Sequence, residues 1–326
     1  MGKLDAVAKE YMSRNDRFAD AFNFVIYDGR QVIKPDELVE MDASEIAIPF
    51  LDKKSIPVQK LRDLLKNWKV MRDEKAIYVF LGIELQGEIH YAMPVRNILY
   101  DVLNYADQVK VRSKQREEEG KGNKGSAEFL SGYGKEDKLI PVITLTIYLG
   151  TDKWDGPKSL REMFGEQSKE ILSMIPDYRL NLISPESIGK TEFDKFSTEL
   201  GAVLEFIKYS KDKEQLGEIV KTKDSYKSLD RDTVRLLNEA AGLKIEMKEE
   251  EDQINMCQAI EEMKAESKAI GKAEGKIEGK AEGQTEGIQK VITIFNHLYS
   301  EGRDSDVRRA SADPEYLKEL LKEYEN

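Results

Sequence analysis

The chain has 326 residues, of which 35% are charged and 40% hydrophobic, and its formal net charge is -11 at pH 7. Such a composition predicts one substantial core with solvated helical parts, and the negative balance argues against a protein that coats nucleic acid generally. Cys257 is the single cysteine, which excludes an intrachain disulfide and a cysteine-rich zinc site. The longest apolar run, 139–149, is too short to span a bilayer, so we expect a cytoplasmic protein without a membrane partner.

Residues 16–27 predict an amphipathic helix that would cover one face of a sheet, because their apolar side chains recur at helical spacing. That stripe consists of Phe18, Ala21, Phe22, Val25 and Ile26. A further helix start is indicated by Pro35, but the mixture of acidic and apolar residues that follows it, up to Phe50, is ambiguous between helix and strand.

The next two apolar segments carry acidic side chains. Residues 76–86 predict a buried β-strand with Glu84 and Gln86 at its far end, where a spacing of two directs both side chains to the same side. Upstream, Asp63 interrupts the apolar segment 61–65, which could pair with that strand as a hairpin. An acid on one strand and a Glu-x-polar pair on the next can hold a divalent metal such as Mg²⁺ against a phosphate.

The following segment, 91–109, predicts a helix with a packing face and an exposed face. The packing face would contain Val95, Leu99, Val102, Leu103 and Ala106, and the exposed face Arg96, Tyr100 and Asn104. Arg96 and Tyr100 lie one helical turn apart, so together they can contact a phosphate through a positive charge and a phenolic hydrogen bond. A surface ion pair for Arg96 and core packing for Tyr100 are the simpler interpretations.

Residues 111–137 are rich in Lys, Glu, Gly and Ser and cannot bury much apolar surface, which predicts a flexible insertion. Residues 139–149 have the strongest strand pattern, apolar on both faces and therefore central in a sheet. A helix over 160–174 and a short strand over 178–183 follow. This order of strands and helices predicts a mixed α/β sheet with helices packed on its faces.

These motifs, in this order, resemble the Rpn family of recombination-promoting nucleases, which are also described as putative transposases. The resemblance rests on Ile83-Glu84-Leu85-Gln86, the helix with Arg96 and Tyr100, the apolar strand ending Tyr148-Leu149-Gly150, and Trp154 with Ser159-Leu160. It covers roughly the N-terminal two thirds of the chain. The family is similar to the PD-(D/E)XK nuclease superfamily, which implies a restriction-endonuclease-like αβββαβ core and metal-dependent hydrolysis of DNA.

The resemblance also implies roles for individual residues. Asp63 and Glu84 match the two strand acids that bind metal in that superfamily, either Mg²⁺ or another hard cation such as Ca²⁺ or Mn²⁺. Gln86 falls where most members have Lys, so a neutral amide would orient the attacking water and catalysis would depend more on the metal. The acid expected from the first helix is open between Asp16 and Asp20.

The C-terminal third is predicted to be helical. Residues 191–243 contain a packing stripe made of Phe193, Phe196, Leu200, Val203, Leu204 and Ile207. In 271–287 a glycine recurs every four residues, which on a helix gives a glycine stripe between a lysine edge and a glutamate edge. Such a helix is weak alone, because each glycine costs about 1 kcal/mol relative to alanine. Parallel pairing would set the lysine edge of one chain against the glutamate edge of another, so we expect self-association, with a solvated linker as the alternative.

The sequence therefore predicts an α/β, restriction-endonuclease-like domain followed by an all-helical region with a glycine-rich repeat helix. The expected divisions are 1–190 for the nuclease domain, 191–250 for a helical brace, 251–290 for the oligomerising repeat helix, and 291–326 for a small helical end in which Asp313 caps a helix. The expected function is a Mg²⁺-dependent DNA endonuclease linked to recombination or mobile elements, with Asp63, Glu84 and Gln86 as catalytic residues and Arg96 and Tyr100 contacting DNA. The alternative is an inactive nuclease-like scaffold that assembles complexes through its repeat.

Overall fold

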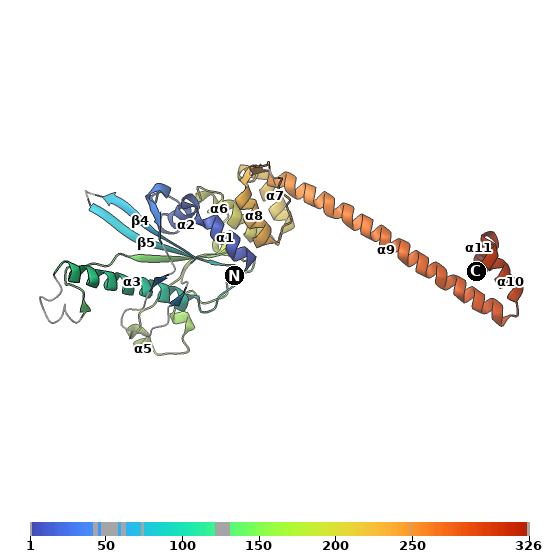
Figure 1. The fold of residues 1–326 in the computed structure, drawn as a ribbon, viewed down its shortest axis with the longest axis horizontal. Coiled ribbons are helices and arrows are strands. Elements are labelled where there is room, and N and C mark those ends of the chain that lie inside the picture. Colours follow the sequence, from blue (N-terminus) through green and yellow to red (C-terminus); the bar gives the residue numbers. More distant parts are fainter. Residues whose placement is uncertain are drawn as a thin grey trace. The chain divides into compact units, whose positions relative to one another are not determined.

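The structure is a computed structural model that describes residues 2–41, 45–46, 58–59, 63–72, 75–120, 131–248 and 250–324. The chain divides into two compact units, Met1–Ala259 and Ile260–Asn326. The first unit is a mixed α/β structure and the second is helical (Figure 1). Among the described residues, no helix combines the length and the apolar character needed to cross a membrane.

A five-stranded mixed sheet forms the centre of the first unit, with the strand order β1-β4-β5-β6-β7. Its strands are β1 (Leu38–Glu40), β4 (Leu64–Arg72), β5 (Lys75–Gln86), β6 (Val142–Tyr148) and β7 (Asn181–Ile183). The pairs β1–β4 and β4–β5 are antiparallel, whereas β5–β6 and β6–β7 are parallel. The predicted hairpin and the predicted interior position of the 139–149 strand are confirmed, and Asp63 directly precedes β4 instead of interrupting it.

Helices surround this sheet and brace it. In the described part of the first unit they are α1 (Lys3–Ser13), α2 (Asn15–Tyr27), α3 (Met93–Glu118), α5 (Lys169–Met174), α6 (Leu200–Tyr209), α7 (Lys213–Thr222) and α8 (Arg231–Ala241). Two small antiparallel pairs are also present, β2 (Glu45–Ile46) with β3 (Val58–Gln59) and β8 (Leu229–Asp230) with β9 (Gln253–Ile254). The predicted stripe over 193–207 is buried throughout, which confirms its packing role.

One face of the sheet is mostly apolar, with Lys66 as a buried exception, and lies on the side of α1, α2 and α6, opposite α3 (Figure 1). Strand alternation places Leu64, Ile83, Leu145 and Ile147 on this face, and all of them are almost fully buried. Phe18, Ala21 and Phe22 of α2 are buried as well, while Val25 and Ile26 remain 39% exposed. These buried apolar side chains form a hydrophobic core on this side of the sheet.

The face of the sheet toward α3 is partly polar, and this reverses the predicted orientation of the helix. Thr144 and Thr146 of β6 point to α3. There Thr144 donates a hydrogen bond to Asp101, and Thr146 accepts one from Asn97. Tyr100 and Asn104 are buried with them, whereas the apolar residues Val95, Leu99 and Val102 are 44%, 45% and 52% exposed. The predicted packing of Val95, Leu99 and Val102 and the predicted exposure of Tyr100 and Asn104 are therefore wrong. Leu103 is buried and Arg96 partly exposed, as predicted, and Tyr100 is buried as its simpler interpretation expects. The helix faces this way because the buried hydroxyl groups of Thr144 and Thr146 need hydrogen-bond partners, which the polar face of α3 provides.

Other predicted elements are shorter than expected or continue differently. The segment 160–174 forms a 3₁₀ turn at Arg161–Met163 and then the short helix α5, and the strand expected over 178–183 is confined to β7. In the segment 111–137, α3 continues to Glu118, and Asp137 forms ion pairs with Arg112 and Arg116. Residues 121–130 of that segment lie outside the described residues.

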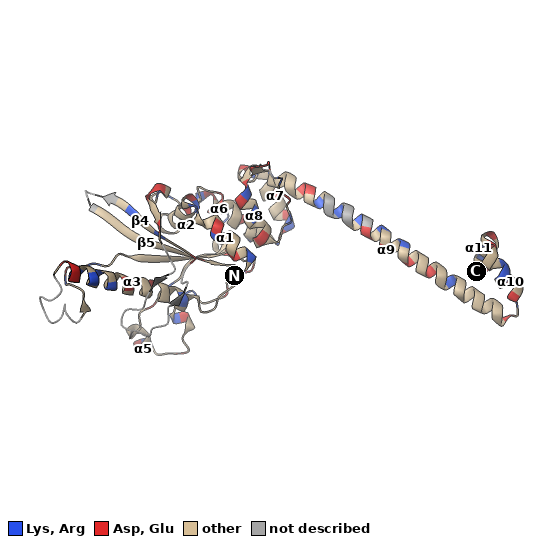
Figure 2. Ribbon diagram, viewed as in Figure 1, with Lys and Arg blue, Asp and Glu red and all other residues tan. Residues whose placement is uncertain are grey.

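The second unit contains all but the first residues of α9 (Met256–Ser300), followed by α10 (Asp304–Ala312) and α11 (Pro314–Glu323). Its small core consists of Ile294, Leu298, Val307, Ala310 and Leu320. Asp313 caps α11 by accepting hydrogen bonds from the backbone N–H groups of Glu315 and Tyr316, as the sequence predicts. The repeat is helical, and Figure 2 shows Lys and Glu alternating along it.

Candidate active site at the ends of β4 and β5

Asp63 and Glu84 are brought together by the β4–β5 hairpin. Leu64 pairs with Ile83, so the register continued by one residue sets Asp63 opposite Glu84. Asp63 is half-buried, and its Oδ2 accepts a hydrogen bond of 2.9 Å from the backbone N–H of Leu85. This bond fixes the side chain of Asp63 against β5, next to Glu84. Asp63 thus lies at the end of the strand that neighbours β5, as the sequence predicts.

Glu84 is fully buried, with 0% of its side chain exposed, and it forms an ion pair with Arg96 of α3. The Oε2 to Nη2 distance is 3.1 Å, and the Arg96 side chain is 36% exposed. A buried carboxylate needs such a partner, because an uncompensated charge in the interior is costly. Burial lowers the pKa of Arg96, but the Glu84 carboxylate and the Tyr100 hydroxyl outweigh it and hold that pKa above its ordinary value.

Tyr100 lies beside the ion pair. Its hydroxyl accepts a short hydrogen bond from Nε of Arg96, and the guanidinium stands 5.6 Å from the centre of its ring. Burial raises the pKa of Tyr100, and the Glu84 carboxylate raises it further. Tyr100 therefore remains a neutral phenol at neutral pH and keeps a proton that it can donate.

Gln86 follows on the same face of β5 and is half-buried. It stands opposite Tyr148 of β6, and its backbone carbonyl accepts a hydrogen bond of 2.8 Å from the N–H of Leu149. The charges of Asp63 and Glu84 both act on Arg96 and Tyr100, so these four predicted site residues lie close together. Gln86 lies two residues beyond Glu84 on β5.

A buried polar network that the sequence interpretation missed holds α3 against the site. Asn97 donates to Thr146 Oγ1 at 2.8 Å, and Thr146 is the β6 residue opposite Glu84. One turn further on, Asp101 accepts hydrogen bonds from Thr144 at 2.6 Å and from Tyr178 at 2.7 Å. The alternation of Thr144 and Thr146 in β6, matched by Asn97 and Asp101 four apart on a helix, was the available indication.

The two acids considered for the first helix are engaged elsewhere. Asp16 pairs with Arg14 at 2.7 Å, and Asp20 is fully buried, where its carboxylate accepts hydrogen bonds from Ser197 and Thr198. Both belong to α2, on the other side of the sheet from α3 (Figure 1). Within the described ranges, no group of three or more His, Cys, Asp or Glu side chains is arranged to hold a metal.

Trp154 also has a settled packing role. Its side chain is 4% exposed, its ring meets that of Tyr148 edge-on at 5.3 Å, and its Nε1 donates to the carbonyl of Gly156. With so little of its ring exposed, Trp154 is a packing residue and does not offer a free ring face on which a base could stack.

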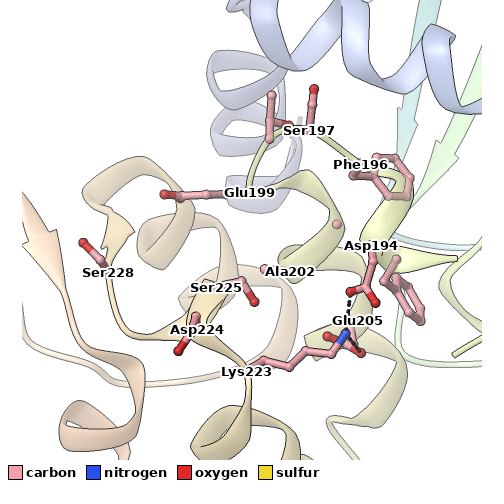
Figure 3. A pocket seen from close by; sticks show the side chains of 13 residues that line it. Asp194, Phe196, Ser197, Glu199, Ala202, Glu205, Lys223, Asp224, Ser225 and Ser228 are labelled. Atoms are coloured by element: carbon pink, nitrogen blue, oxygen red, sulfur yellow. Dashed lines mark hydrogen bonds and ion pairs between the residues drawn. The ribbon is translucent and has the colours of Figure 1, made fainter. Parts of the chain in front are cut away.

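A second polar site lies between α6 and the residues that follow α7, around a cavity of about 380 Å³ (Figure 3). Lys223 points toward Asp194 and Glu205, and its Nζ is 2.9 Å from an oxygen of each. Asp194 is 69% exposed, but Glu205 is only 1% exposed and also accepts a hydrogen bond from Tyr226. Lys223 therefore neutralises a carboxylate that has no access to water.

No family model, curated protein or solved structure matches the chain. What the fold establishes is a mixed α/β class, with a five-stranded mixed sheet, flanking helices and a helical C-terminal region.

Proposed function

We propose that the chain is a metal-dependent DNA endonuclease of the Rpn type, acting in the cytoplasm in recombination or on mobile elements. The observation that carries the proposal is the meeting of Asp63 and Glu84 on adjacent strands beside Arg96 and Tyr100. Two carboxylates next to a cationic and a phenolic side chain provide groups for a metal and for a phosphate in one place.

The order of elements supports the proposal. The first helices are followed by β1, β4 and β5 in antiparallel pairing, then by α3 and by β6 parallel to β5. With the small β2–β3 pair set aside, this is the αβββαβ order that the resemblance to PD-(D/E)XK nucleases implies.

The donor set fits a hard divalent cation. Asp63 and Glu84 would hold it, and carboxylate oxygens are the ligands that Mg²⁺, Mn²⁺ and Ca²⁺ prefer. When bound, the metal would stabilise negative charge on the phosphate and lower the pKa of a bound water. The cation would then neutralise the buried Glu84 carboxylate, which Arg96 neutralises in this structure.

The remaining side chains would bind and orient the substrate. Arg96 is half-exposed and can donate to a phosphate oxygen, and Tyr100 retains the proton needed for a second hydrogen bond. Gln86 would orient a water through its amide, because it carries no charge with which to activate one.

The competing function is a nuclease-like scaffold without catalysis. The observation in its favour is the Glu84–Arg96 ion pair itself, which already satisfies the buried carboxylate without a metal. Supercoiled plasmid incubated with the purified full chain and Mg²⁺, Mn²⁺ or Ca²⁺ separates the two. We expect nicking that requires a metal and stops with a chelator; no nicking under any of the metals would favour the scaffold.

We also propose that the protein self-associates through α9. A Cβ added to a glycine of the repeat would meet no heavy atom within 4 Å beyond the adjoining residues and the backbone of its own helix. This holds for Gly271, Gly275, Gly279, Gly283 and Gly287. The glycine stripe can thus accept the backbone of a second helix at close range, with the lysine edge of each chain facing the glutamate edge of the other.

Replacing Gly275, Gly279 and Gly283 together by leucine tests this interface. Each change favours the helix by about 0.8 kcal/mol, yet the added side chains would hold a second backbone away. We expect helix content to rise in circular dichroism while the mass in light scattering falls. Ile277→Ser, which alters a 71% exposed residue outside the glycine stripe, is the matched control. If the leucine variant associates as well as the wild type, the proposal that the chains pair through the glycine stripe is wrong.

A further inference from the structure

Arg96 is paired with one of the carboxylate oxygens that a metal would need. Its guanidinium lies 3.1 Å from Oε2 of Glu84, and the side chain of Glu84 is 0% exposed. A divalent cation and a guanidinium on one carboxylate would repel each other in a partly buried site, where screening by water is weak.

Arg96 differs from Glu84 in being partly exposed to solvent. Its side chain is 36% exposed, whereas the backbone around it is held by the bonds of Asn97 and Asp101 to β6. Rotation of the Arg96 side chain toward solvent would break its contacts with Glu84 and Tyr100 but would not require movement of α3. The partner that would draw it outward is a phosphate, which guanidinium groups bind through paired hydrogen bonds.

We infer that Arg96 is an internal counter-ion that holds the metal site closed until a nucleic-acid phosphate engages it, so that metal binding and DNA binding are coupled through Glu84. The inference rests on the proposed function, because it takes Glu84 as a metal ligand. The coupling is reciprocal: DNA raises the affinity for the metal by the same factor by which the metal raises the affinity for DNA.

Binding of Mn²⁺ to the full chain, followed by electron paramagnetic resonance without any cleavage, tests the inference. We expect Arg96→Gln to bind Mn²⁺ about tenfold more tightly than the wild type, because the competing cation is gone. Arg96→Lys keeps the positive charge and should stay near the wild-type affinity. A short DNA duplex should tighten Mn²⁺ binding in the wild type and have little effect in Arg96→Gln.

Glu84→Gln distinguishes the ways in which the inference can fail. If Glu84→Gln loses the Mn²⁺ site but Arg96→Gln binds no more tightly than the wild type, the counter-ion role is wrong and the metal site stands. If neither the wild type nor Arg96→Gln has a Glu84-dependent site, the inference falls together with the proposed function. Thermal unfolding of Arg96→Gln and Arg96→Lys shows whether each variant is folded before binding is compared.

Discussion

Glu84→Gln is expected to reduce metal-dependent nicking of plasmid DNA by about 10³-fold. Glutamine has nearly the same volume, so the buried position between β4, β6 and α3 stays filled. What is lost is the negative charge with which Glu84 would bind the proposed divalent cation. The fold should survive, because the partner left behind, Arg96, is half-exposed and can reach water. The measurement is the initial rate of nicking at saturating Mg²⁺.

Two further variants make that result specific. Asp63→Asn should lower the rate by a similar factor, since it removes the charge on the neighbouring strand end while its side chain can still accept from the N–H of Leu85. Glu88→Gln removes an exposed carboxylate just beyond β5 and should leave the rate unchanged. Nicking that persists in both Glu84→Gln and Asp63→Asn would remove the metal site from this position, whereas loss in Glu88→Gln would point to a general effect of charge.

The sheet was predictable because its strands carry their own patterns. The run 76–86 is apolar and ends in two polar residues spaced by two, and it forms β5 with Glu84 near its end. The 139–149 run is apolar enough to mark an interior strand. Strand pairing could also be anticipated for the segment near Asp63, although the strand extends downstream of it, to Arg72. These local patterns determine which strands exist and roughly where the acids lie.

The orientation of α3 could not be predicted from its own sequence. The helix has an apolar stripe that looks like a packing face, yet Val95, Leu99 and Val102 are exposed. The deciding factor is the opposite surface, where Thr144, Thr146 and buried Glu84 need hydrogen bonds and a counter-charge. Helical periodicity gives the faces of a helix, but the chemistry of the sheet chooses between them. Because the polar face of α3 faces the sheet, Arg96 forms its ion pair with Glu84 and Tyr100 lies beside that pair.

Lys223→Met is expected to destabilise the first unit by about 3 kcal/mol. Methionine keeps much of the length and apolar stem of lysine, but it leaves the Glu205 carboxylate buried without a positive partner. The hydrogen bond from Tyr226 to Glu205, at 3.3 Å, cannot replace a charge. Urea unfolding followed by tryptophan fluorescence measures the change, and the double variant Lys223→Met with Glu205→Gln should recover most of the loss.

The other carboxylate bound by Lys223 provides the matched control for this prediction. Asp194 is also 2.9 Å from the Lys223 ammonium but is 69% exposed, so Asp194→Asn should change the free energy of unfolding by less than about 0.5 kcal/mol. Although burial lowers the pKa of Lys223, the carboxylates of Asp194 and Glu205 raise it above its ordinary value. The stabilisation is therefore fully present at neutral pH and is lost only as the pH rises through that raised pKa. Equal losses from Lys223→Met and Asp194→Asn would mean that burial of Glu205 does not set the strength of this contact.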